Sequence, residues 1–121
     1  MNRQRLILLG CVVIVLFGTR GWAQDLNSGN GLLVSCQTSI RQMDNPGMTL
    51  SFSEGLYDGY CTGIVTGVTA ASPLVCPGKG ATVGQEIRVV VKFLQDHPEK
   101  LNLRNTDLIE QALSEAFPCS K

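Results

Sequence analysis

Residues 51–72 read SFSEGLYDGYCTGIVTGVTAAS and place glycines at a strict spacing of four: Gly55, Gly59, Gly63 and Gly67. Residues four apart lie on one face of a helix, so the stretch predicts a helix with a glycine face made by these four residues. Each interior glycine costs roughly 1 kcal/mol relative to alanine, and four cost on the order of 3–4 kcal/mol. Close approach by another element would offset this cost. We expect the glycine face to pack tightly within a small bundle, with a seam between two copies as the alternative.

The remainder of the chain predicts three further helices. Apolar residues recur at three- and four-residue steps from Gly31 to a turn at residues 44–47, again after Thr82, and again from about Thr106. The run of valines at 89–91 would suit a strand by propensity, but apolar and polar residues there separate onto opposite helix faces. Capping-box spacings in residues 51–54 and 82–85 indicate two of the helix starts. The predicted fold class is all-α, a small four-helix bundle.

The first 23 residues have the pattern of a secretory signal peptide. Arg3 and Arg5 form a charged start, residues 6–17 an apolar run, and residues 21–23 a small-x-small cleavage site ending at Ala23. A lipoprotein signal ending at Cys11 fits less well, because the apolar run continues beyond the cysteine. We therefore expect an exported protein, with residues 24–30 as a flexible N-terminal segment and residues 31–121 as one helical domain. We expect no membrane association after cleavage.

Charge excludes some partner classes. Loss of residues 1–23 removes three arginines and no acids, which leaves seven basic and ten acidic residues and a net charge of −3. No basic stripe interleaved with aromatic residues remains, so we expect no nucleic-acid binding.

Four cysteines remain after signal cleavage: Cys36, Cys61, Cys76 and Cys119. An even number in an oxidising compartment predicts disulfides. Cys36 and Cys61 fall near the middle of the first two helices, whereas Cys76 precedes the third helix and Cys119 follows the fourth. Of the three connectivities that four cysteines allow, this topology favours Cys36–Cys61 and Cys76–Cys119.

The polar residues form no recognisable catalytic constellation. His97 is the single histidine, and its place at a helix end favours an interaction with the negative end of the helix dipole over a role as a general base. There is no C-x-x-C motif, and the glycines at 78–80 lack the spacing of a phosphate loop. We therefore expect a non-enzymatic binding protein with no cofactor and no metal.

Five segments, in this order and spacing, carry a family resemblance: residues 31–36 (GLLVSC), 61–68 (CTGIVTGV), 76–77 (CP), 97–99 (HPE) and 112–119 (ALSEAFPC). Together they resemble the Rap/Tai family of type VI secretion immunity proteins across nearly the whole mature chain. One departure is Ile64, which stands where the family often has an aromatic residue.

The resemblance implies a disulfide-bonded, all-helical periplasmic protein, often a homodimer. It would bind a cognate peptidoglycan amidase toxin and block its active-site groove sterically. A periplasmic acid-stress chaperone of the same size and architecture is the alternative function, although it would be expected to carry titrating acids at an interface.

Residues 72–80 are the predicted contact loop for the toxin. Prolines and glycines restrict this loop, Cys76 tethers it, and Leu74 and Val75 are expected to be exposed. A restricted loop loses little conformational entropy on binding, so we expect contacts from Ser72, Leu74, Val75 and Lys79.

Overall fold

The computed structural model describes residues 25–120, and the predicted signal peptide lies outside them. Within this range the chain forms four α-helices and one short 3-10 helix: α2 (Gly29–Asp44), α3 (Phe52–Ala71), α4 (Val83–Asp96), η1 (Pro98–Lys100) and α5 (Asn105–Ala116). The all-α prediction with four helices is confirmed.

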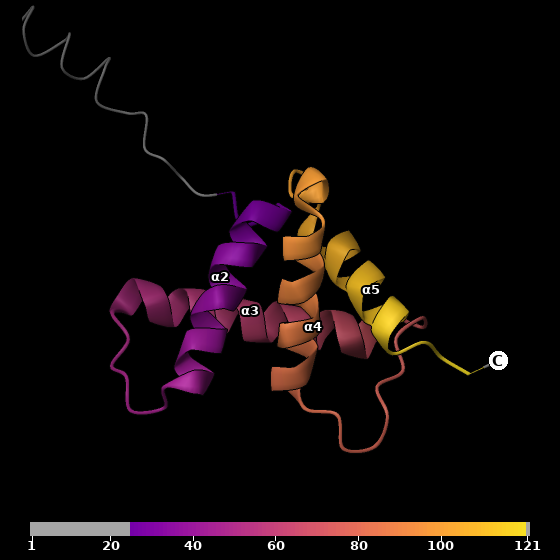
Figure 1. The fold of residues 1–121 in the computed structure, drawn as a ribbon, viewed down its shortest axis with the longest axis horizontal. Helices are drawn as coiled ribbons and strands as arrows, with labels where there is room; N and C mark the ends of the chain where they lie inside the picture. Colours follow the sequence, from indigo (N-terminus) through magenta and orange to yellow (C-terminus); the bar gives the residue numbers. More distant parts are fainter. Residues whose placement is uncertain (1–24, 121) are drawn as a thin grey trace, which may run out of the picture.

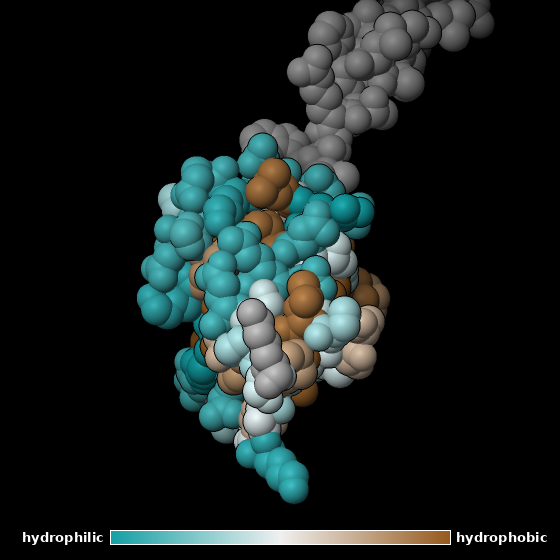
Figure 2. Space-filling view, turned by 90° about the vertical axis from the view of Figure 1, so that its right-hand side faces the viewer, coloured by the Kyte–Doolittle hydropathy of each residue, from teal (hydrophilic) through white to brown (hydrophobic). Residues whose placement is uncertain are grey.

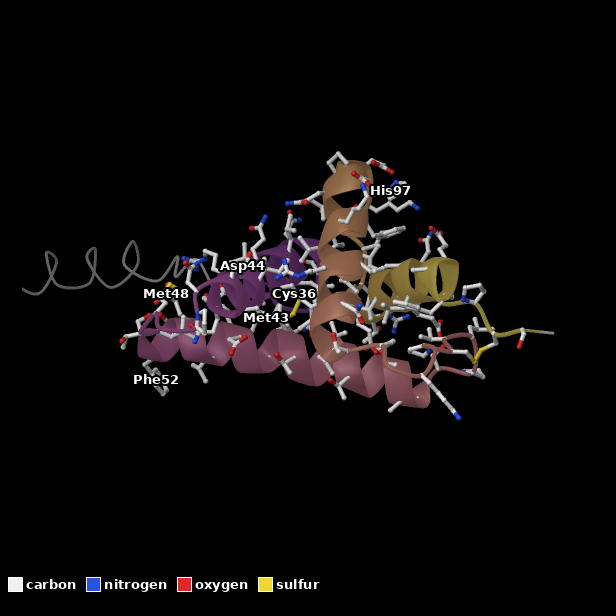
Figure 3. The ribbon with its side chains drawn as sticks, turned by 60° about the horizontal axis from the view of Figure 1, so that its bottom comes forward. Cys36, Met43, Asp44, Met48, Phe52 and His97 are labelled. Atoms are coloured by element: carbon white, nitrogen blue, oxygen red, sulfur yellow. A yellow bond between two sulfur atoms is a disulfide. The ribbon has the colours of Figure 1, made fainter. Side chains whose placement is uncertain are left out.

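The longest helix, α3, organises the fold. Its 20 residues extend about 30 Å at the usual rise per residue. It lies across α2, α4 and α5 and contacts each of them, while α4 packs between α2 and α5 (Figures 1 and 3). The arrangement therefore differs from four helices running alongside one another, because three helices cover one side of the fourth.

The helix starts follow the capping chemistry of the sequence. Ser51 and Thr82 each close a capping box, with Glu54 and Gln85 respectively, as the spacing predicts. The first helix begins at Gly29, two residues earlier than expected, because Ser28 is its N-cap. Ser28 and Gly29 are buried, and Gly29 and Asn30 form the first two residues of α2.

The hydrophobic core lies where the four helices meet. Its buried members come from every helix and from one loop residue: Leu32, Cys36, Cys61, Val65, Val75, Ile87, Val90, Val91, Phe93, Leu94, Leu108, Ile109, Ala112 and Leu113. Both predicted disulfides are present. Cys36–Cys61 joins α2 to α3 within this core, and Cys76–Cys119 joins the α3–α4 loop to the C-terminal segment.

The expectation that the glycine face packs inside the bundle is wrong. A Cβ atom placed on any of its four glycines meets no other group within 4 Å in the part of the chain that the structure describes. The reason is tertiary: α2, α4 and α5 all lie on one side of α3 (Figure 3), and α3 turns Cys61 and Val65 toward them. The glycine face is left on the opposite, exposed side.

Gly31, unlike the glycines of the glycine face, lies against the backbone of another segment, residues 25 and 26. A Cβ atom on Gly31 would lie 2.7 Å from the Cα of Leu26 and still closer to the carbonyl oxygen of Asp25. We expect Gly31→Ala to push residues 25–27 off the start of α2 and lower the free energy of unfolding by about 1–3 kcal/mol. Urea unfolding measures this loss. Gly47→Ala, where a Cβ meets nothing within 4 Å, is the control; equal stability of the two variants would contradict the expectation.

Candidate functional site

The contact loop is held to the C-terminal segment by a disulfide and by backbone pairing. Cys76 is disulfide-bonded to Cys119, and its backbone N–H donates to the Phe117 carbonyl oxygen at 2.9 Å. Val75 and Pro118 form an isolated antiparallel β-bridge. The middle of the loop is therefore fixed in position before any partner arrives.

Ser72 connects the start of the contact loop to α5 by a hydrogen bond. Its hydroxyl donates to Glu110 Oε1 at 2.5 Å and accepts from the Leu74 N–H at 3.2 Å. Of the predicted contact residues, Ser72 therefore has a structural role as well as a half-buried position at the surface.

The two apolar residues of the loop point to opposite sides. Leu74 is 57% exposed, as predicted, whereas Val75 is 5% exposed and belongs to the core. The prediction that Val75 is exposed is wrong. Successive side chains in extended backbone alternate, and the bridge to Pro118 turns Val75 inward. Leu74 is left as the apolar residue that the loop presents to solvent.

Lys79 lies at the far end of the contact loop. The Ala81 N–H donates to the Gly78 carbonyl oxygen at 3.0 Å, which closes a turn around Lys79. Gly80 within this turn has φ of +91°, a value that glycine adopts readily and L residues rarely do. The structure thus brings Ser72, Leu74 and Lys79 into one fixed loop, with Val75 beneath it.

A second exposed apolar surface lies on the outer side of α3. Phe52 is 84% exposed and Leu56 is 58% exposed, beside the glycine face. Figure 3 shows Phe52 pointing away from the other three helices. In Figure 2, which views the end of the molecule that carries α5, hydrophilic residues cover one side while pale and brown residues gather on the other. The sequence alone did not single out Phe52 or Leu56 as exposed, because periodicity does not say which face of a helix is covered.

Structural contacts shift the pKa of three titratable groups among the described residues. The Ser51 backbone N–H, with the Ser51 hydroxyl, lowers the pKa of Glu54 below its usual value. The backbone N–H of Glu99 and the nearby imidazole of His97 likewise lower the pKa of Glu99. Burial raises the pKa of Tyr60, whose hydroxyl donates to the Leu26 carbonyl oxygen.

His97 itself sits at the C-terminus of α4. Its ring lies 4.6 Å from the Phe93 ring, centroid to centroid, and its Nδ1 is 3.1 Å from Glu99 Oε1. Within residues 25–120, no three His, Cys, Asp or Glu side chains gather in a way that could hold a metal ion. None of the helices in that range is both long and apolar enough to cross a membrane.

Comparison with known proteins identifies the family. The family model of Rap1a immunity proteins matches residues 28–119, which is more than half of the chain, and the chain belongs to this family. No curated protein and no solved structure matches it. Membership implies a non-enzymatic immunity role that requires binding to a cognate effector toxin.

Proposed function

We propose that the chain neutralises a type VI secretion effector of the peptidoglycan amidase class, and that it does so in the periplasm after signal cleavage near Ala23. Family membership over residues 28–119 supports the immunity role. The signal-like pattern of residues 1–23 and the two disulfides support an oxidising, exported location.

Inhibition in this proposal is steric, through insertion of the contact loop into the active-site groove of the amidase. The observation that carries it is the exposure of Leu74 on a restrained loop. The Cys76–Cys119 disulfide, the Val75–Pro118 bridge and the Ser72–Glu110 hydrogen bond hold this loop in place. An apolar anchor on a preordered loop loses little entropy on binding, so most of its burial contributes to affinity.

The direct test is protection in a bacterial host. The candidate amidase from the neighbouring gene is exported to the periplasm, with and without this chain, and lysis is followed by turbidity. We expect lysis with the amidase alone, and survival together with co-purification when both are present. Lysis in both cases, with no complex, would contradict the immunity proposal. Protection of a client protein from aggregation at about pH 2–3 would then favour the acid-stress chaperone.

We also propose that a second copy of the chain covers the outer side of α3. The four glycines carry their helix-propensity cost although a Cβ at any of them would meet no other group of residues 25–120 within 4 Å. The same side bears bulky Phe52 and Leu56 toward one end and Gly63 and Gly67 toward the other. Two antiparallel α3 helices would therefore place the bulky residues of one copy over the glycines of the other.

Gly63→Leu tests this dimer. A Cβ at Gly63 meets no described group within 4 Å, so the monomer fold should accept a leucine there. In the dimer, the leucine side chain would prevent close approach of the two α3 helices. We expect the mass measured by light scattering to fall from two copies to one, with Gly47→Leu as a control that stays dimeric. A monomeric parent protein, or a Gly63→Leu variant that remains a dimer, would contradict the proposal.

A further inference from the structure

A cavity of about 590 Å³ opens between the contact loop and the first turns of α4. Its wall includes Ala81, Val89 and Phe117, all of which are half-buried. Lys79 from the loop and Arg88 from α4 also line it, and none of the described residues that line it is an Asp or a Glu. The cavity therefore combines an apolar wall with two positive charges.

Both cations have capacity for a further acceptor. Arg88 donates to Asp44 Oδ1 at 2.6 Å through one amino group of its guanidinium, and its side chain remains 48% exposed. A guanidinium has five N–H donors, so a single contact leaves others available. Within residues 25–120, Lys79 forms no ion pair.

The walls of the cavity are fixed from several directions. On the Phe117 side, the Phe117 carbonyl oxygen accepts a hydrogen bond from the Cys76 N–H, and the neighbouring Cys76–Cys119 disulfide holds the same wall. On the opposite side, the capping box of Thr82 and Gln85 fixes the start of α4. A cavity with fixed walls can receive a ligand without first being ordered, which favours binding.

We infer that this cavity receives a segment of a partner protein in which an apolar side chain is adjacent to a carboxylate. The apolar side chain would pack against Val89 and Phe117, and the carboxylate would lie between Lys79 and Arg88. Charge complementarity carries the inference, because this positive site lies in a mature chain whose net charge is −3. This inference rests on the proposed function, in which the partner is the toxin. The toxin would then contact both the cavity and Leu74.

Blocked dipeptides test the chemistry of the cavity without the toxin. Acetyl-Leu-Glu-amide and acetyl-Leu-Lys-amide are titrated into the 15N-labelled mature protein. We expect the acidic peptide to shift the backbone amides of residues 78–81, 88 and 89, and to bind at least about fivefold more tightly than the lysine peptide. Equal binding of the two peptides, shifts elsewhere only, or no shifts would overturn the inference.

Variants then test whether the toxin uses the cavity. Lys79→Gln with Arg88→Gln should weaken binding to the catalytically inactive amidase roughly tenfold. Lys92→Gln is the matched control, since Lys92 is on α4, pairs with Asp96 and does not line the cavity. A Cβ at Gly78 meets no described group within 4 Å, so Gly78→Leu should leave the chain folded, narrow the mouth of the cavity and weaken amidase binding. Gly47→Leu, at a glycine with equally open surroundings, should leave amidase binding unchanged.

These outcomes separate the two proposals. If the parent chain protects cells and binds the amidase but the Lys79/Arg88 variant binds equally well, the cavity inference fails and the immunity function stands. If the parent chain gives no protection, the immunity function fails, and the dipeptide titration still decides whether the cavity selects an acidic, apolar segment.

Discussion

Replacing Cys36 and Cys61 together with alanine is expected to lower the free energy of unfolding by about 3–5 kcal/mol and the melting temperature by roughly 15–25 °C. The bond closes a separation of 25 residues, for which restriction of the unfolded chain alone accounts for about 3.5 kcal/mol. Both cysteines are 0% exposed in the core, so the two missing sulfur atoms also leave a void between α2 and α3.

The second disulfide provides the comparison. Cys76–Cys119 closes a longer separation of 43 residues, so chain entropy alone predicts a slightly larger loss, about 4 kcal/mol. Cys76 is exposed and Cys119 half-buried, however, so its removal leaves no internal void. We expect the core bond to contribute more to stability when each double alanine variant is unfolded in urea. A larger loss for Cys76/Cys119 would mean that loop length outweighs burial here.

The features predicted correctly from the sequence are those that short motifs or the order of the helices determine. Capping boxes at Ser51 and Thr82 depend on a four-residue motif, so the starts of α3 and α4 could be placed closely. The disulfide pairing followed from helix order, because Cys76 and Cys119 flank a pair of helices that packs together.

The errors concern contacts between distant residues. The spacing of the glycines predicts that they share a face, but only the placement of α2, α4 and α5 decides which face of α3 is covered. Leu74 and Val75 are adjacent apolar residues, and the bridge to Pro118, 43 positions beyond Val75, decides which of them is buried. A contact to a distant residue also accompanies the start of α2, where Ser28 is the N-cap and Asn30 donates its side-chain amide to the Leu101 carbonyl oxygen at 2.9 Å.

Leu74→Asp is expected to have the largest effect on toxin binding. Leu74 is 57% exposed, so a carboxylate there remains hydrated in the free protein and the free energy of unfolding should change by less than about 0.5 kcal/mol. In the complex the same carboxylate would be desolvated against the groove. An anchor residue of this kind contributes about 2–4 kcal/mol, so the dissociation constant should rise roughly 30- to 1,000-fold and protection from lysis should be lost.

Leu103→Asp is the matched control for Leu74→Asp, because Leu103 is 48% exposed and lies between η1 and α5, outside the contact loop. Calorimetry with the catalytically inactive amidase gives both dissociation constants, and unfolding curves check that both variants are folded. Leu74→Met, which keeps an apolar side chain of similar volume, should bind within a few-fold of the parent chain. A complex that tolerates Leu74→Asp as well as Leu103→Asp would exclude Leu74 as the inhibitory anchor. Because Val75 is buried beneath the loop, the contact surface would then have to be sought at the cavity or on the outer side of α3.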